Sequence, residues 1–345
     1  MTHQVGATRR VLRQERTYWQ AVLAKLLRDK LTLAAMFGLT VMVSLALAAP
    51  WLSHSVLGYD PTDTDLRQRN APPTWMAEAW PKFQQFTRSC QAGDCQWSLW
   101  QEIISSSVNG LGTCFTAGPG KCHWLGTDQA GRDVLSRGLH GGRISLRIGA
   151  YVAGIALTLG VLMGLLSGYY AATLVDDIVN AIIQTLGSIP LLFLLIILSR
   201  IFQPGPEGLS LLIGAFGWMG ISRLIRGQIF SIREREYITA SRAVGASTWR
   251  IMTRHLLPNV SSIVIVVGVF NIAGAIISEA GLSYLGVGIG PPLPSWGNMM
   301  QGSLGNFTDA PWLVLAPGLF IFLTTLSIYL IGDGLRDALD PWVKA

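Results

Sequence analysis

The stretch that decides the fold is Tyr237–Asn259, which reads YITASRAVGASTWRIMTRHLLPN. It is polar and carries arginines, yet it lies between apolar runs that are long enough to cross a bilayer. Because arginine is costly in hydrocarbon, the segment must lie in water, and the basic bias around it indicates the cytoplasmic side. The pattern predicts a helix, a break at Gly245, a second helix and a stop at Pro258.

The composition also indicates a membrane protein. Of the 345 residues, 50% are apolar and 13% are charged, whereas soluble domains carry about 25% charged residues. The net charge of +6 gathers beside the apolar runs, which marks cytoplasmic ends and argues against a nucleic-acid-binding face. The clustered residues are Arg9, Arg10, Arg13, Arg16, Lys25, Arg28 and Lys30 before the first run, and Arg223, Arg226, Arg233, Arg235, Arg242, Arg250 and Arg254 in or beside the opening segment.

Hydropathy predicts an all-α membrane protein with about six transmembrane helices, since helices satisfy their backbone groups internally in hydrocarbon. A kink is expected at Pro190 in the third helix. Six spans place both termini and the opening segment in the cytoplasm. The predicted spans are 31–52, 144–170, 178–202, 208–225, 260–282 and 312–331.

The spans divide the chain into five regions. Residues 1–30 and 336–345 are cytoplasmic tails, 31–52 is the first span, 53–140 is an extracytoplasmic loop, and 141–335 is a five-helix core. Before the first span, apolar residues recur at helical spacing. They predict either an amphipathic helix on the cytoplasmic surface or an extension of the first span. These residues are Tyr18, Trp19, Val22, Leu23, Leu26 and Leu27.

The four cysteines all fall in the 53–140 loop, and no span carries one. An exported loop is an oxidising location, so two disulfides are expected, with three pairings open. The simplest pairing is Cys90 with Cys95 and Cys114 with Cys122. A zinc site is not expected, because only His123 is nearby and the spacing fits no common zinc motif.

The second predicted span is rich in glycine. Small residues let membrane helices approach closely, although glycine is also simply common in such helices. Both explanations remain open for Gly149, Gly154, Gly160, Gly164 and Gly168.

The opening segment resembles the EAA loop of ABC importer permeases, whose pattern is E-A-A-x3-G-x9-I-x-L-P. The glycine, the spacing and the final L-P are kept, but the glutamate is absent and His255 stands at the isoleucine position. The residues at the remaining positions of the pattern are Thr239, Ala240, Ser241, Gly245, Leu257 and Pro258.

Further motifs are similar to the "C" subunit of the oligopeptide/dipeptide/nickel permease family. They cover most of residues 125–341, whereas residues 53–124 depart from the short loop of that family. The motifs are LGTDQAGRD at 125–133, GRISL at 142–146, GLSYLG at 281–286, SWG at 295–297 and GDGLRDALDP at 332–341.

The resemblance implies a type I (MetI-like) importer permease fold, with an inserted extracytoplasmic subdomain, in a bacterial inner membrane. It implies a second permease subunit, two ATPase subunits that bind ATP and Mg, and an extracytoplasmic substrate-binding protein. This chain itself would bind no cofactor. The residues expected to couple it to an ATPase are Thr239, Ala240, Ser241, Gly245, Trp249, Arg250, Leu257 and Pro258.

Glu279 is an ionisable residue near the outer end of the fifth span. Such a residue is a functional candidate, so Glu279 either lines the substrate path or is a locally satisfied structural glutamate. Gln184, Ser188 and Asn271 are further polar candidates for the path.

The chain lacks the G-x-x-x-x-G-K-[ST], G-x-S-x-G and H-E-x-x-H motifs, so neither ATP binding by a P-loop nor a recognisable hydrolase site is predicted. A stand-alone ion-coupled secondary transporter is the alternative function, but internal repeats and charged pairs at mid-membrane are not evident. Peptides, nickel complexes and short sugars all remain open as substrates.

Overall fold

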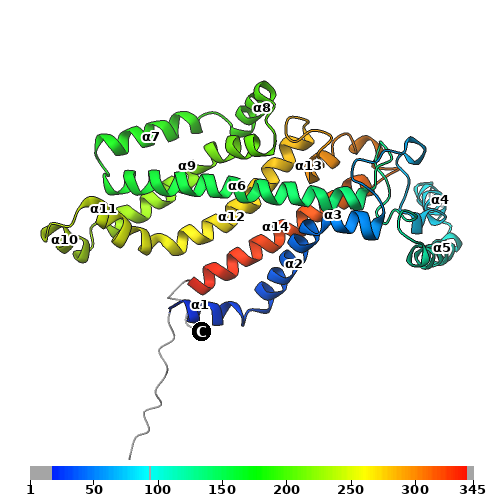
Figure 1. Cartoon of the computed structure of the whole chain (residues 1–345), viewed down its shortest axis with the longest axis horizontal. Coiled ribbons are helices and arrows are strands. Elements are labelled where there is room, and N and C mark those ends of the chain that lie inside the picture. The colour runs from blue at the N-terminus through cyan, green and yellow to red at the C-terminus, as the bar shows by residue number, and fades with distance from the viewer. Residues whose placement is uncertain (1–17, 93–94, 340–345) are drawn as a thin grey trace, which may run out of the picture.

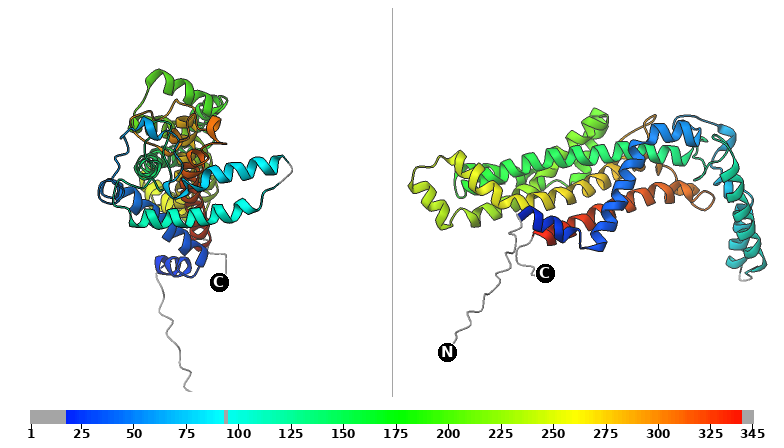
Figure 2. Two further views of the ribbon diagram at one scale, coloured as in Figure 1. Left: turned by 90° about the vertical axis from the view of Figure 1, so that its right-hand side faces the viewer. Right: turned by 60° about the horizontal axis from the view of Figure 1, so that its bottom comes forward.

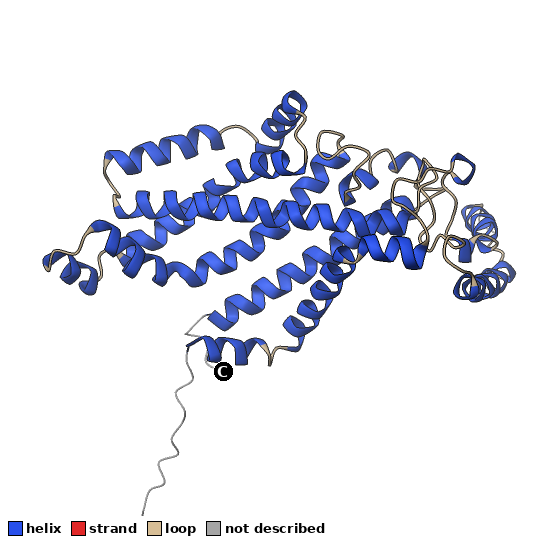
Figure 3. Cartoon of the chain, in the orientation of Figure 1, coloured by secondary structure: helices blue, strands red, loops and turns tan. Residues whose placement is uncertain are grey.

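The computed structural model describes residues 18–92 and 95–339, and the helices dominate both ranges (Figure 3). Within them, the only β-type pairing is an isolated bridge between Thr127 and Asp133. The all-α prediction is thereby confirmed, while residues 1–17 and 340–345 of the two predicted tails lie outside the described residues. The α-helices are α1 (Tyr18–Leu26), α2 (Lys30–Leu47), α3 (Ala49–Leu52), α4 (Ala79–Gln91), α5 (Ser98–Thr116), α6 (Val134–Tyr169), α7 (Leu174–Gly187), α8 (Leu191–Phe202), α9 (Pro206–Ile232), α10 (Glu236–Ala243), α11 (Thr248–Ile251), α12 (Leu257–Tyr284), α13 (Trp296–Met299) and α14 (Trp312–Leu339).

Five helical stretches are long and apolar enough to cross a membrane, and a bent pair would supply a sixth. This agrees with the predicted number of spans. The five are α2, α6, α9, the continuous stretch Thr248–Tyr284, and α14; the bent pair is α7 with α8.

The third predicted span is interrupted at Pro190, as expected, but by a break between two helices and not by a kink within one helix. α7 ends at Gly187, α8 begins at Leu191, and the two are bent by 79°. Pro190 lacks an N–H and disfavours helical backbone at the residue before it, and together these effects end the first helix.

Most other predicted spans are shorter than the helices that contain them, because a helix can continue past the hydrocarbon. α9 extends to Ile232 and α14 to Leu339. α6 begins at Val134, so the last residues of the region predicted as the 53–140 loop are already helical. Asp133 caps this helix, and its carboxylate accepts a hydrogen bond from the Ser136 amide at 2.7 Å.

α1 is a separate helix that precedes the first span. Asp29 caps α2 by accepting a hydrogen bond from the Leu31 amide at 3.1 Å, which ends any continuity between the two helices. Val22 is buried with Val266 and Leu339, whereas Leu23 is 55% exposed. α1 is therefore not a continuous extension of the first span, and its location on the cytoplasmic surface stays a prediction.

A seam of glycines joins α6 to α9. Three glycines at four-residue spacing face three isoleucines at the same spacing, and a methyl group added to any of them would come within 2.7 Å of the facing isoleucine Cβ. Gly154 of α6, in contrast, has open space beside it. The close-packing explanation therefore holds for the seam and not for Gly154. The facing pairs are Gly160 with Ile221, Gly164 with Ile225, and Gly168 with Ile229.

The long loop folds into a hairpin of α4 and α5, with Lys82 paired to Glu102 at 3.1 Å. Cys90 is bonded to Cys95 and Cys114 to Cys122, which is the simplest pairing suggested by the sequence. The hairpin lies at one end of the molecule, and α10 and α11 lie at the other (Figures 1 and 2). The two features predicted for opposite sides of the membrane are thus far apart.

The end of the hairpin is tied to the start of α6. His123 Nδ1 lies 2.8 Å from the Asp133 carboxylate, and the Tyr59 ring stacks on His123 at a centroid distance of 4.1 Å. Burial, together with the charge of Asp133, raises the pKa of Tyr59 to about 12. Tyr59 therefore stays protonated and neutral at physiological pH.

Candidate functional site

The segment between α9 and α12 consists of two short helices joined at Gly245, as predicted from its sequence. Gly245 has φ +78°, in the left-handed region, and ends α10. The amides of Gly245 and Ala246 donate to the carbonyls of Arg242 and Ser241 at 3.0 Å each. This is a Schellman motif, in which glycine is the residue that adopts the required backbone at least cost.

The predicted stop at Pro258 is wrong, because the helix runs continuously through it to Tyr284. A single wide π-type turn, Met252–Leu256, comes immediately before the proline. Pro258 then occupies the first turn of α12, where its missing N–H costs little. The wide turn leaves room for the proline ring, which would otherwise clash with the carbonyl one turn back.

The segment is anchored on its inner side by Ile238, which is fully buried. Ile238 packs in one apolar cluster with Ile229 and Ile232 of α9 and with Leu256 and Val260 on the other side of the segment. α10 therefore cannot move without displacing the adjoining ends of α9 and α12.

Two arginines connect the segment to the end of α6. The Arg233 guanidinium donates to the carbonyls of Tyr169 and Ala171 at 3.1 and 3.4 Å. The Arg242 guanidinium lies over the Tyr169 ring, 5.1 Å from its centroid. Cations are favourable at the C-terminal end of a helix, where the last carbonyls are unpaired. The segment thus contacts three membrane helices, α6, α9 and α12.

The outward side of the segment is exposed and partly apolar. Val244 is 85% exposed and Trp249 is 71% exposed. Arg242, Arg250 and Arg254 are exposed beside them, which makes the surface basic. Large apolar side chains displayed at the tip of a molecule, with a polar rim, are typical of a protein-binding surface.

The predicted coupling residues lie along this tip. Thr239 stands where the EAA pattern has its glutamate, so this position carries no negative charge. The Thr239 hydroxyl donates a hydrogen bond to the Arg235 carbonyl at 3.4 Å. The neighbouring Glu234 pairs with Arg233 at 2.9 Å. Exposed members of the predicted set are Thr239, Ala240, Gly245, Trp249, Arg250 and Pro258, and half-buried ones are Ser241 and Leu257.

Glu279, the first candidate for the substrate path, is fully buried between α6 and α12. Its carboxylate accepts hydrogen bonds from the hydroxyls of Ser145 and Ser283 at 2.8 and 2.7 Å. The Ser145 hydroxyl in turn accepts from the Trp296 amide at 3.4 Å. These contacts favour a structural role for Glu279 over a role in the substrate path, because its described hydrogen-bond partners are side chains that pack against it.

The other path candidates are not gathered around a common cavity. Gln184 and Ser188 are exposed on α7 or at its end, and the Ser188 hydroxyl donates to the Thr185 carbonyl at 2.7 Å. Asn271 of α12 is half-buried, and its Oδ1 atom has no hydrogen-bond partner among the described residues. A buried unpaired acceptor is a reason to keep Asn271 as a candidate.

A charged contact between α7 and α9 was not foreseen from the sequence. The Arg226 guanidinium donates twice to the Asp176 carboxylate, at 2.7 Å each, and the Ser167 hydroxyl donates at 2.6 Å. Asp176 is buried and Arg226 is half-buried. The sequence contains one clue to this contact, because Asp176 and Asp177 stand at the start of a largely apolar helix. However, Arg226, the partner of Asp176, lies 50 residues further along the chain.

Two family models match the chain. Residues 156–345 match "Binding-protein-dependent transport system inner membrane component", and residues 17–73 match "N-terminal TM domain of oligopeptide transport permease C". The first match includes the Tyr237–Asn259 segment and the helices that it contacts, apart from the beginning of α6.

Individual relatives are similar over most of their length. The glutathione transport system permease protein GsiD of Pectobacterium atrosepticum is 39% identical over 66% of this chain and 75% of its own length. The oligopeptide transport system permease protein OppC of Bacillus subtilis is 38% identical over 66% of this chain and 74% of its own. A Brucella suis relative is 33% identical over 89% of this chain and 87% of its own.

Proposed function

Because the chain belongs to the family of binding-protein-dependent transport system inner membrane components and is a permease subunit of an ABC importer, we propose that its substrates are peptides. The observation that carries this proposal is the sequence similarity between this chain and relatives named for the transport of short peptides. Relatives named for oligopeptide, dipeptide and glutathione transport are 38 to 39% identical to this chain. All three names describe short peptides or a peptide-like solute.

An uptake experiment tests the substrate class. Cells that carry the complete importer should accumulate a labelled dipeptide or tripeptide, and unlabelled peptides should compete, whereas a nickel chelate and a disaccharide should not. Cells without this chain should lose that uptake. Competition by the chelate or the disaccharide, with none by peptides, would overturn the proposed substrate class.

The α10–α11 segment is proposed as the contact that couples this chain to an ATPase subunit. Its exposed Val244 and Trp249 offer a surface for a soluble partner, and its buried Ile238 fixes it to the membrane helices. A displacement of the segment would therefore reach α6, α9 and α12 together. This proposal places the segment in the cytoplasm with both termini, and the α4–α5 hairpin outside.

The proposed assembly contains this chain, a second permease subunit, two ATPase subunits and an external binding protein. ATP and Mg belong to the ATPase subunits, because this sequence has no P-loop. The contribution of this chain is to form half of the path and to respond to the ATPases, so the chain alone has no catalytic role.

Gly245→Val should reduce peptide uptake at least tenfold. A β-branched residue is strained at φ +78°, by about 1–2 kcal/mol, so the joint between α10 and α11 would change shape. Space is not the cause, since nothing lies within 4 Å of an added Cβ. The measurement is peptide uptake together with peptide-stimulated ATP hydrolysis by the reconstituted importer.

Two controls accompany this variant. Gly245→Asn should keep most uptake, because asparagine tolerates left-handed backbone. Gly227→Ala, at an uncrowded glycine of α9, should also be mild. Normal uptake by Gly245→Val, at normal amounts of the protein, would contradict the coupling role.

A further inference from the structure

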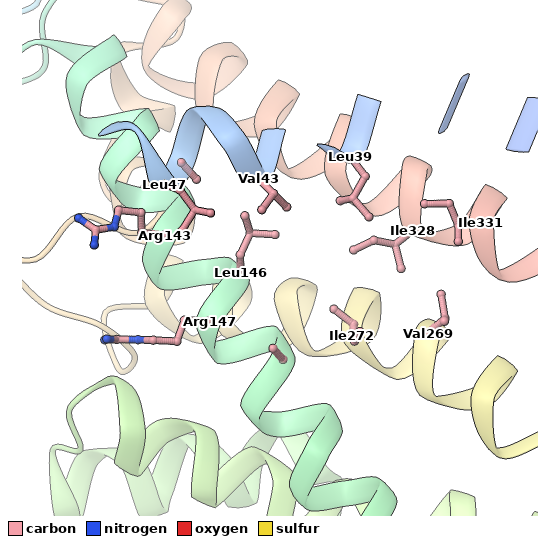
Figure 4. A pocket seen from close by; sticks show the side chains of 12 residues that line it. Leu39, Val43, Leu47, Arg143, Leu146, Arg147, Val269, Ile272, Ile328 and Ile331 are labelled. Carbon is pink, nitrogen blue, oxygen red and sulfur yellow. The ribbon is translucent and has the colours of Figure 1, made fainter. Parts of the chain in front are cut away.

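Two cavities meet at a pair of arginines on α6. The larger cavity, of about 530 Å³, lies between α2, α6, α12 and α14 (Figure 4). Its walls are almost wholly apolar, and Arg143 and Arg147 are its charged lining residues. The apolar lining includes Leu39, Val43, Leu146, Ala150, Ile272 and Ile328.

The smaller cavity, of about 310 Å³, shares Arg143 and Arg147 with the larger one. Its other polar lining residues are Thr62 and His140. The two arginines are four residues apart and so lie on one face of α6. Both guanidinium groups extend to the same side, away from the apolar side chains of the larger cavity (Figure 4). The two cavities therefore form an apolar compartment with a basic recess at its edge.

The positive charge of the recess is only partly matched by the described residues. Arg147 pairs with Glu207 at 3.1 Å, but both side chains are largely exposed, so the pair is weak. Arg143 has no ion-pair partner among the described residues. One unmatched positive charge thus remains beside an apolar cavity. Arginine suits a phosphate here, because its planar group can donate two hydrogen bonds to phosphate oxygens.

The depth of the arginines fits the edge of a bilayer. α6 has 36 residues and is therefore about 54 Å long, whereas the hydrocarbon of a bilayer is about 30 Å thick. The charged residues of α6 all lie between Arg137 and Arg147, near its start, so this end of the helix extends beyond the hydrocarbon. Arg143 is about 14 Å from the start of the helix, near the level of the headgroups, while Ala150 and the lining residues of α12 and α14 lie deeper.

We propose that these cavities form a binding site for an anionic phospholipid. An acyl chain occupies the apolar cavity, and the phosphate lies against Arg143 and Arg147. The membrane supplies this ligand at high local concentration, and its single negative charge matches the unmatched arginine. The site does not depend on which solute the importer carries.

The test measures lipid binding to the complete purified importer by native mass spectrometry. The probes are phosphatidylglycerol and phosphatidylcholine, added to delipidated protein. The wild type should bind phosphatidylglycerol more tightly than phosphatidylcholine. Arg143→Gln with Arg147→Gln should weaken phosphatidylglycerol binding by about tenfold or more, since each arginine near an anionic headgroup contributes about 1 kcal/mol. Arg223→Gln, an exposed arginine of α9 outside both cavities, is the matched control.

A second variant tests the apolar half of the site. Ala150→Phe fills the larger cavity and leaves both arginines in place, so it should also weaken retention of phosphatidylglycerol. Unchanged binding in both variants, or equal binding of the two lipids, would overturn the proposal. So would cross-linking of the Val43→Cys variant to the second permease subunit, because the larger cavity would then be a subunit interface.

Discussion

Gly164→Val is expected to separate α6 from α9 and to reduce the amount of folded permease in the membrane at least tenfold. An added Cβ would lie 2.7 Å from the Ile225 Cβ and 2.8 Å from the Ser222 carbonyl oxygen. A change of rotamer does not move the Ile225 Cβ, and the carbonyl belongs to the backbone of α9, so neither atom can move without that helix. The helices would have to part along the seam, at a cost of about 3 kcal/mol.

The energetic cost of parting α6 from α9 is large because the solvent around them is lipid. Between helices in a membrane, lipid is as apolar as the side chains, so close packing itself holds α6 and α9 together. The measurement is the thermal stability and yield of the protein in detergent, with Gly154→Val as the matched control. Gly154 lies in the same helix with nothing within 4 Å of an added Cβ. Equal yields for the two variants would show that the seam does not determine stability.

Glu279→Ala is expected to lower the stability of the protein by about 3 kcal/mol. The substitution leaves the buried hydroxyls of Ser145 and Ser283 without their acceptor and creates a cavity between α6 and α12. The effect should extend to the loop between α12 and α13, because the Ser283 hydroxyl also accepts from the Ile289 amide at 2.9 Å. Unfolding monitored in detergent by the fluorescence of the tryptophans measures the change.

Two further variants distinguish a structural role of Glu279 from a role in transport. Glu279→Gln keeps the shape and one acceptor oxygen, so it should cost only about 1 kcal/mol and leave uptake intact. Ser278→Ala, at the exposed neighbouring position, should change neither quantity. If Glu279→Gln instead altered the uptake of charged peptides at unchanged stability, Glu279 would belong to the substrate path.

Features encoded by local composition were predictable from the sequence. The spans follow from hydropathy, and the break at Gly245 follows from the need for a left-handed residue between two helices. The course of the chain at Pro258 was not predictable in the same way. A proline normally ends a helix, but here a wide turn leads directly into α12, which has Pro258 in its first turn.

Features that depend on distant partners could not be predicted. Asp176 and Asp177 stand next to each other in the sequence, and the pairing of Asp176 with Arg226 arises only once α7 and α9 pack together. The glycines of α6 likewise cannot be distinguished from the sequence, but in the structure Gly164 faces Ile225 and Gly154 faces open space. The sequence also could not show that Ser145 and Ser283 donate to the carboxylate of Glu279.

The two disulfides impose an order on the maturation of this chain. Cys114 and Cys122 are bonded at the end of the hairpin, and His123, the next residue, contacts the cap of α6 at Asp133. Such bonds do not persist in a reducing cytosol. In the proposed orientation, the hairpin therefore gains its covalent ties only after its export. The α6–α9 seam contains no cysteine and can form under either redox condition, so a failure of oxidation would first affect the outer end of the protein.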